Sequence, residues 1–166
     1  PIVPVREEDG SWVTTQVALP GRTLTARVWC CQVGRTPLYL LDADYEANLE
    51  EDRQVTHHLY GGDWENRLKQ EILLGVGGIR ALAKMGIKQE VYHCNEGHAA
   101  FIGVERVRNL MSRKKLSFSE ALEVVRSSSL FTTHTPVPAG HDAFPESMIR
   151  QYMSHYPEVL GITWDQ

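Results

Sequence analysis

The chain has 166 residues, of which 42% are hydrophobic and 23% are charged, and its formal net charge is −4. This size and composition fit one globular domain, and the acidic balance disfavours nucleic acid as a partner. No apolar run is long enough to span a membrane, and the N-terminus lacks a signal-peptide pattern. We therefore expect a cytoplasmic piece of a longer protein, since the first residue is not Met. The three cysteines have no disulfide spacing, and Cys30 and Cys31 lie in an apolar, strand-like run, so we expect these two to be buried, reduced thiols.

The first part of the chain is predicted to be β structure. Residues 11–18 and 24–33 are rich in Val, Thr and Trp, and Pro20-Gly21 marks the turn between them. A third strand is predicted over residues 36–41. The acidic residues 46–52 follow, and their composition is typical of a solvated helix or loop.

Residues 64–85 carry a helical pattern. Asp63 is a good N-cap, and Gly86 is a good residue to end the helix. Apolar side chains recur every three or four positions, at Leu68, Ile72, Val76, Ile79 and Leu82. The three glycines of residues 75–78 weaken a helix, and they indicate that another backbone passes close to it.

The second part of the chain alternates helices and strands. Strands are predicted over residues 90–94 and 129–133. The helices between them cover residues 97–113 and 117–126, of which the second begins with a capping box. A last helix begins near Pro145 and is ended or followed by Pro157. This order predicts a parallel sheet, in which ligands bind at the carboxyl ends of the strands.

Polar side chains gather where these two strands end. One segment, YHCNEGH, covers residues 92–98, and the other covers residues 132–136 and continues to His141-Asp142. Hydrogen bonds from His, Asn, Glu and Thr suit a neutral polyol such as a sugar. The helix dipole favours a neutral imidazole at His98, and Glu96 is placed to orient this ring or to bind a hydroxyl.

Other roles stay open for the same side chains. A histidine at the end of a strand is commonly a structural hydrogen-bonding residue. The possible metal ligands are His93, Cys94, His98, His134 and His141, which would suit a metal-dependent hydrolase. However, no Cys-x-x-Cys or His-Glu-x-x-His pattern is present.

At these two segments the chain resembles the α-glucan (glycogen, maltodextrin or starch) phosphorylases, especially their shorter bacterial and archaeal branch. The resemblance rests on VYHCNEGHAAF, residues 91–101, and LFTTHTPVPAGHDAF, residues 130–144. Supporting stretches are PLYLLDAD at 37–44, LYGGD at 59–63 and RLKQEILLGVGGIRAL at 67–82. The resemblance covers nearly the whole chain.

This resemblance implies a fold and an activity. The family has the GT-B architecture, with two Rossmann-like domains facing each other, and residues 1–166 would be one partial N-terminal domain. The implied fold class is α/β, with a parallel sheet and flanking helices. The family is a group of hexosyltransferases that cleave α-1,4-glucans with inorganic phosphate and release glucose 1-phosphate with retained configuration. Its enzymes often dimerise, so a homo-oligomer is expected.

The resemblance also implies a cofactor and site residues. Pyridoxal phosphate is attached to a lysine of the missing C-terminal domain, so we expect no cofactor here and no activity from the isolated chain. His134 matches the histidine that binds the sugar's hydroxymethyl group, and His98 and Glu96 match the sugar-side histidine and acid. His98 and His134 are thus the expected catalytic residues, while Asn95, Glu96 and Thr135 are expected to bind substrate.

A non-catalytic glucan-binding module is the alternative from another functional class. Such modules present an aromatic platform to the sugar. The four tryptophans are scattered in the sequence, at positions 12, 29, 64 and 164, and no pattern groups them.

Overall fold

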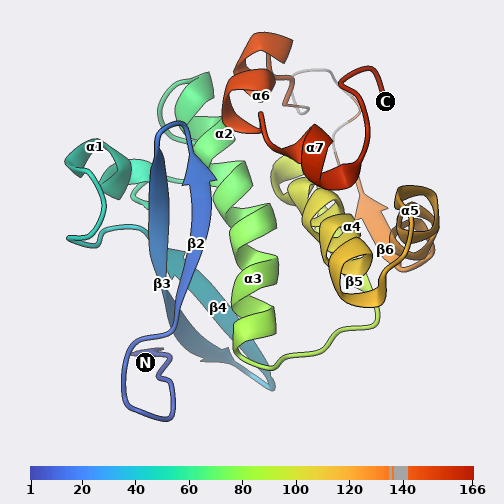
Figure 1. Ribbon diagram of the computed structural model, residues 1–166. Helices are drawn as coiled ribbons and strands as arrows, with labels where there is room; N and C mark the ends of the chain where they lie inside the picture. Colours follow the sequence, from blue (N-terminus) through green and yellow to red (C-terminus); the bar gives the residue numbers. More distant parts are fainter. Residues whose placement is uncertain (135, 137–141) are drawn as a thin grey trace. The chain divides into compact units, whose positions relative to one another are not determined.

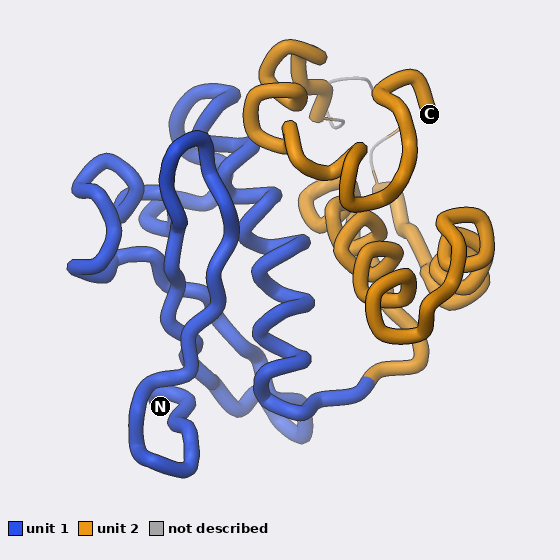
Figure 2. The backbone as a smooth tube through the Cα atoms, viewed as in Figure 1, with its two compact units in different colours: residues 1–88 blue, residues 89–166 orange. Residues whose placement is uncertain are grey.

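The computed structural model describes residues 1–134, 136 and 142–166 (Figure 1). The chain divides into two compact units, an N-terminal unit of residues 1–88 and a C-terminal unit of residues 89–166 (Figure 2). The single domain expected over residues 1–166 stays a prediction beside this division. Within the described part of the chain, no helix has the length and apolar composition that a membrane span needs.

The N-terminal unit contains a four-stranded antiparallel sheet. Its longest strand, β3 (Arg22–Val33), pairs with β1 (Ile2–Pro4), β2 (Thr14–Leu19) and β4 (Thr36–Asp42). The turn at Pro20-Gly21 joins β2 to β3, as the sequence predicts. A parallel sheet was expected for the chain, but so short a connection joins only antiparallel strands.

A long helical stretch packs on β2. It is helical from Trp64 to Lys84, as predicted, but it changes type: α2 (Trp64–Ile72) leads into the π-helical η2 (Leu73–Gly77) and then α3 (Gly78–Lys84). The Asp63 side chain caps it by accepting a hydrogen bond from the backbone N–H of Asn66. Four of the five predicted apolar positions are buried, namely Leu68, Ile72, Val76 and Ile79.

Gly77 lies where this stretch meets the sheet. The Thr15 hydroxyl on β2 donates a hydrogen bond of 2.7 Å to the Gly77 carbonyl. A Cβ at position 77 would lie 3.3 Å from Cγ1 of Val17 and 3.1 Å from Cδ1 of Leu73. Space is therefore tight at Gly77, but the atoms close to it belong to side chains and not to the backbone that the glycines predicted. A Cβ at Gly78 would meet nothing within 4 Å.

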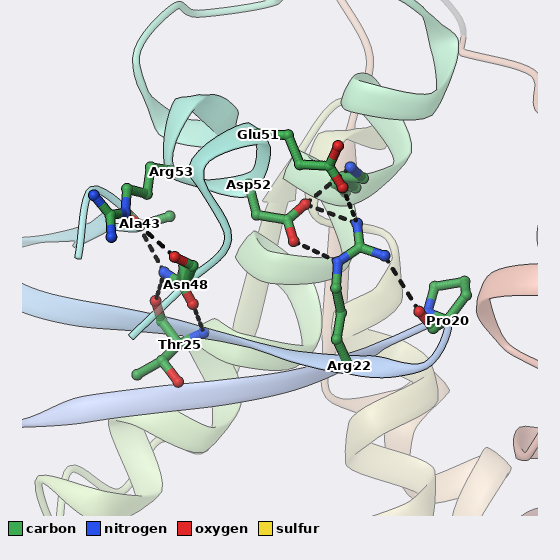
Figure 3. A network of polar contacts seen from close by, with 9 residues as sticks. Pro20, Arg22, Thr25, Ala43, Asn48, Glu51, Asp52 and Arg53 are labelled. Carbon is green, nitrogen blue, oxygen red and sulfur yellow. Dashed lines mark hydrogen bonds and ion pairs between the residues drawn. The ribbon is translucent and has the colours of Figure 1, made fainter. Parts of the chain in front are cut away.

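The acidic segment is less solvated than its composition suggests. It contains the short helix α1 (Glu50–Arg53), which is followed by the 3-10 turn η1 (Gln54–Thr56). Asp52 is only 1% exposed, because Arg22 holds its carboxylate with hydrogen bonds of 2.5 and 2.9 Å and Lys69 adds one of 3.0 Å (Figure 3). The prediction of a solvated segment is thus wrong at this position.

Asn48 fixes the other end of the same segment. Its side chain accepts a hydrogen bond from the backbone N–H of Thr25 on β3 and donates to the carbonyls of Thr25 and Ala43 (Figure 3). These bonds replace solvent for a buried amide. The segment is consequently fastened to β3 by polar contacts at both Asn48 and Asp52.

The C-terminal unit contains the predicted parallel strands. β5 (Tyr92–Asn95) and β6 (Ser129–Thr132) pair in parallel from Tyr92↔Ser129 to Asn95↔Thr132. Between them lie α4 (Phe101–Lys114) and α5 (Phe118–Ser127), and α5 begins with the predicted capping box of Ser117 and Glu120. The chain is therefore α/β, with a parallel strand pair and helices.

The end of the chain differs from its prediction. Two short helices, α6 (Glu146–Tyr152) and α7 (Tyr156–Leu160), replace the single predicted helix. Pro145 is the N-cap of α6, while Pro157 lies in the first turn of α7. Pro157 thus begins a helix instead of ending one, because a first-turn residue needs no backbone N–H donor.

Candidate functional site

The carboxyl ends of β5 and β6 form the candidate site. Because the two strands are parallel and Asn95 pairs with Thr132, the loops that follow them leave the same edge of the sheet. The ladder extends one step further, since the Glu96 N–H donates to the Thr132 carbonyl at 2.8 Å. The 3-10 turn η3 (Gly97–Ala99) then leads from β5 into α4.

The carboxylate of Glu96 holds the second loop. Its Oε1 accepts a hydrogen bond of 2.6 Å from the backbone N–H of His134, and the residue is only 7% exposed. The charge on the acceptor makes this bond stronger than one between neutral groups. The buried carboxylate thus holds the backbone in place at His134, just after β6.

Glu96 has an unusual backbone conformation, with φ +63° and ψ −170°. This region is almost restricted to glycine, and a residue with a side chain is destabilised there by about 1–3 kcal/mol. A hydrogen bond to a charged group contributes about 1.5–3 kcal/mol, so the His134 contact offsets a strain of this size.

The ring of His134 is also fixed. Its Nε2 lies 2.7 Å from Oδ1 of Asn95, and the side chain is otherwise exposed. An amide oxygen only accepts hydrogen bonds, so the proton of a neutral ring is on Nε2 and Nδ1 is an acceptor. His134 is therefore fixed both at its backbone and at its ring.

His98 forms a separate pair. Its Nδ1 lies 3.4 Å from Oδ2 of Asp142, and both side chains are largely buried. His98 lies in η3, before α4 begins at Phe101, so its expected place at the start of a helix is confirmed to within one turn. The neutral imidazole expected there stays a prediction. Thr135 and His141 lie outside the described residues.

Arg106 on α4 supports the strands from their other end. Its guanidinium lies 3.9 Å from the centre of the Tyr92 ring and donates to the hydroxyls of Ser128 and Ser129 at 2.5 and 2.9 Å. Arg106 is 8% exposed, and this burial lowers its pKa. The sequence does not predict this residue, because no local pattern separates a buried arginine from a solvated one.

Cys94 and His93, two of the possible metal ligands, have other contacts in the structure. Burial raises the pKa of the Cys94 thiol, against the opposing charge of Arg106, and this favours the protonated form. Nε2 of His93 lies 2.6 Å from the Thr132 hydroxyl. Among the described residues, His93, Cys94 and His134 belong to no cluster of three metal donors. All three cysteines are free and half-buried, so the expected burial of Cys30 and Cys31 is wrong, while their reduced state agrees with the prediction.

The aromatic residues of the N-terminal unit are less scattered than the sequence suggests. Trp12 packs edge-on against Trp29, with ring centroids 4.7 Å apart. The guanidinium groups of Arg6 and Arg27 lie 4.7 and 4.4 Å from the centre of the Trp12 ring. Because these cations occupy the Trp12 ring, that ring does not offer an open platform for stacking a sugar.

A polar groove of about 370 Å³ lies in the N-terminal unit, lined by Thr14, Thr15, Gln16, Arg80 and Lys84. Arg80 donates to the carbonyl of Gln16 at 2.9 Å, and Lys84 donates to that of Thr14 at 3.1 Å. These bonds join α3 to β2. The groove contains none of the residues predicted from the sequence.

Comparison with curated proteins finds glycogen and maltodextrin phosphorylases among the relatives of this chain. Glycogen phosphorylase of Mycobacterium tuberculosis H37Rv is 50% identical over 160 residues, which are 93% of this chain and 18% of the relative. Maltodextrin phosphorylase of Thermococcus litoralis is 44% identical over 96% of this chain and 19% of its own length. Glycogen phosphorylase of Aquifex aeolicus is 35% identical over 98% of this chain and 23% of its own. The chain is homologous to a segment of the α-glucan phosphorylases.

The resemblance predicted from the two histidine segments is thereby confirmed, and no family model matches the chain. The chain spans about a fifth of the length of these phosphorylases. The structure brings together Asn95, Glu96 and His134, three of the five predicted site residues.

Proposed function

We propose that this chain is part of the N-terminal, Rossmann-like domain of a GT-B α-glucan phosphorylase and contributes to its glucosyl site. The observation that carries the proposal is the fixing of His134 by Asn95 and Glu96 at the carboxyl ends of two parallel strands. The homology to named glycogen and maltodextrin phosphorylases supports it.

The proposed reaction is the phosphorolysis of an α-1,4-glucan by inorganic phosphate, which releases glucose 1-phosphate with retention. His134 would bind the hydroxymethyl group of the sugar, and its backbone carbonyl would face the positive charge that develops at the anomeric carbon. Fixed dipoles of this kind stabilise such a transition state without reorganising during the reaction. His98 would act on the sugar side, with Asn95, Glu96 and Thr135 lining the substrate.

The proposed enzyme uses pyridoxal phosphate, whose phosphate group supplies the proton relay when bound. The five lysines of this chain do not fit its attachment. Lys69 is held by the buried Asp52, and Lys84 donates to a backbone carbonyl. Lys88, Lys114 and Lys115 are exposed. We therefore place the attachment lysine in another domain and expect no phosphorolysis by this chain alone. A cytoplasmic location and a homo-oligomer belong to the same proposal.

A titration of the ¹⁵N-labelled chain with maltoheptaose tests the proposed sugar contact. Amide shifts centred on His98 and His134 are expected, with zinc chloride as the control addition. A well-dispersed spectrum that the sugar leaves unchanged would contradict a preformed glucosyl site in this chain. A response to zinc alone would favour the metal-dependent hydrolase instead.

A further inference from the structure

Asn95 and Glu96 are consecutive residues, yet both contact His134. Oδ1 of Asn95 meets the ring at 2.7 Å, and Oε1 of Glu96 meets the backbone N–H at 2.6 Å. In a regular strand, neighbouring side chains point to opposite faces of the sheet. Two neighbours in an undistorted strand would therefore not both reach one residue of the next loop.

The backbone of Glu96 accounts for this convergence. Its φ of +63° with ψ of −170° breaks the regular alternation directly after Asn95, the last residue of β5. The Glu96 N–H still completes the ladder to Thr132, so the change of direction falls on the side chain and on the following turn. The strained conformation thus gives the second of two neighbouring side chains access to His134.

From this arrangement we infer that Asn95 and Glu96 form a positioning pair for His134, and that Glu96 acts on the sugar through His134 instead of touching it. The inference rests on the proposed function in assigning the sugar contact to His134. It changes the role expected for Glu96, from substrate binding to positioning. Burial of Glu96 supports the change, because the carboxylate faces the protein.

The two members of the pair control different properties of His134. Asn95 fixes the ring tautomer, with the proton on Nε2, so that Nδ1 of a neutral ring accepts a hydrogen bond from a hydroxyl. Glu96 fixes the backbone N–H of the residue and thereby limits rotation of the chain that follows Thr132. The tautomer of the His134 ring and the hydrogen bond of its backbone N–H can therefore be tested separately.

The direct test is an NMR measurement on the ¹³C,¹⁵N-labelled chain without ligand. A scalar coupling across the hydrogen bond, between the His134 amide nitrogen and Cδ of Glu96, is expected. The ring nitrogens should show a protonated Nε2 and an unprotonated Nδ1 in the neutral form. Absence of the coupling in a folded chain would overturn the positioning role of Glu96.

Three variants separate positioning from general destabilisation. Glu96→Ala should speed exchange of the His134 amide hydrogen about tenfold or more, through loss of a charge-assisted bond. Glu96→Gln keeps an oxygen acceptor and should restore most of the protection and of any sugar affinity. Glu90→Gln, at an exposed site before β5, is the matched control and should change neither. Equal exchange in Glu96→Ala and wild type would contradict the inference.

Addition of maltoheptaose then distinguishes the two proposals. With both correct, the sugar shifts the His134 ring resonances while Cδ of Glu96 keeps its coupling to the amide. A sugar without effect, beside an intact coupling, would count against the proposed function and leave the positioning pair standing. A sugar that removes the coupling and shifts Cδ of Glu96 would show direct substrate binding by Glu96 and overturn the inference.

Discussion

Among the buried carboxylates of the two units, Asp52 and Glu96 are held differently. Asp52 in the N-terminal unit lies in a regular helix between Arg22 and Lys69. Glu96 in the C-terminal unit lies in a strained backbone and accepts from a backbone N–H. The first arrangement stabilises a fold by matching charges. The second accepts local strain in order to place one histidine, which is typical of a functional site.

The largest effect is expected from Asp52→Ala. The change leaves Arg22 and Lys69 without their shared counter-charge in a poorly solvated place. Removing one partner of a buried ion pair is strongly destabilising, and partial exposure of the cations reduces this here to a loss of about 2–3 kcal/mol in unfolding free energy. Urea unfolding measures it. Glu51→Ala is the control, because Glu51 is exposed and its contact with Arg22 is 3.6 Å, so a loss as large as that of Asp52→Ala would contradict the account.

The paired variants Gly77→Ala and Gly78→Ala should differ by about 1–3 kcal/mol in unfolding free energy. Both gain helix propensity, but a methyl group at position 77 meets Val17 and Leu73, whereas one at position 78 meets open space. Thermal or urea unfolding of the two proteins gives the difference directly. Equal stabilities would mean that η2 does not pack tightly on β2.

The pH dependence of stability should reveal the charge pairing of Asp52 with Arg22 and Lys69. Arg22, together with Lys69, lowers the pKa of Asp52 in the folded state. The resulting stabilisation is fully present above the ordinary value of 3.8 and is lost as the pH falls below it toward the folded-state pKa. Urea midpoints measured between neutral and acidic pH should fall less steeply for Asp52→Asn than for wild type. Identical slopes would contradict the charge pairing.

The smallest effect on global stability is expected from Glu96→Ala. The variant loses a charge-assisted hydrogen bond, while alanine still carries part of the backbone strain, so the unfolding free energy should fall by about 1–2 kcal/mol or less. Sugar binding should weaken more than stability does. Calorimetric sugar binding and urea unfolding, measured on the same sample, show whether the loss of binding free energy exceeds the loss of unfolding free energy. A loss of stability larger than that of Asp52→Ala would make Glu96 a structural residue like Asp52.

Local sequence patterns predicted the elements that depend on neighbouring residues. The helical stretch from Trp64, the capping box at Ser117 and the parallel strands β5 and β6 all have signals within a few residues. The π-helical change of type at η2 has no such signal. Pro157 also misled the prediction, because the same residue is compatible with the end of one helix and the start of the next.

Long-range pairing was beyond the sequence patterns. In the sequence, Asp52 looks like any other acid of a polar segment, because its partner Arg22 lies thirty residues away. The histidine segments did predict where the site lies, since strand order determines which loops share an edge. The positive φ of Glu96 could not be predicted from the sequence, because the glycine that usually marks such a conformation is the next residue, Gly97.

The most direct test of the central claim is a chimera in which this chain replaces the matching segment of the Mycobacterium tuberculosis glycogen phosphorylase, with which it shares 50% identity. We predict that the chimera releases glucose 1-phosphate from glycogen and phosphate. His134→Ala should reduce this activity about tenfold or more, because it removes the ring that would bind the sugar's hydroxymethyl group, whereas the backbone carbonyl stays in place. Glu90→Gln should leave it unchanged. A folded, active chimera in which His134→Ala retains full activity would contradict the assignment of this chain to the glucosyl site.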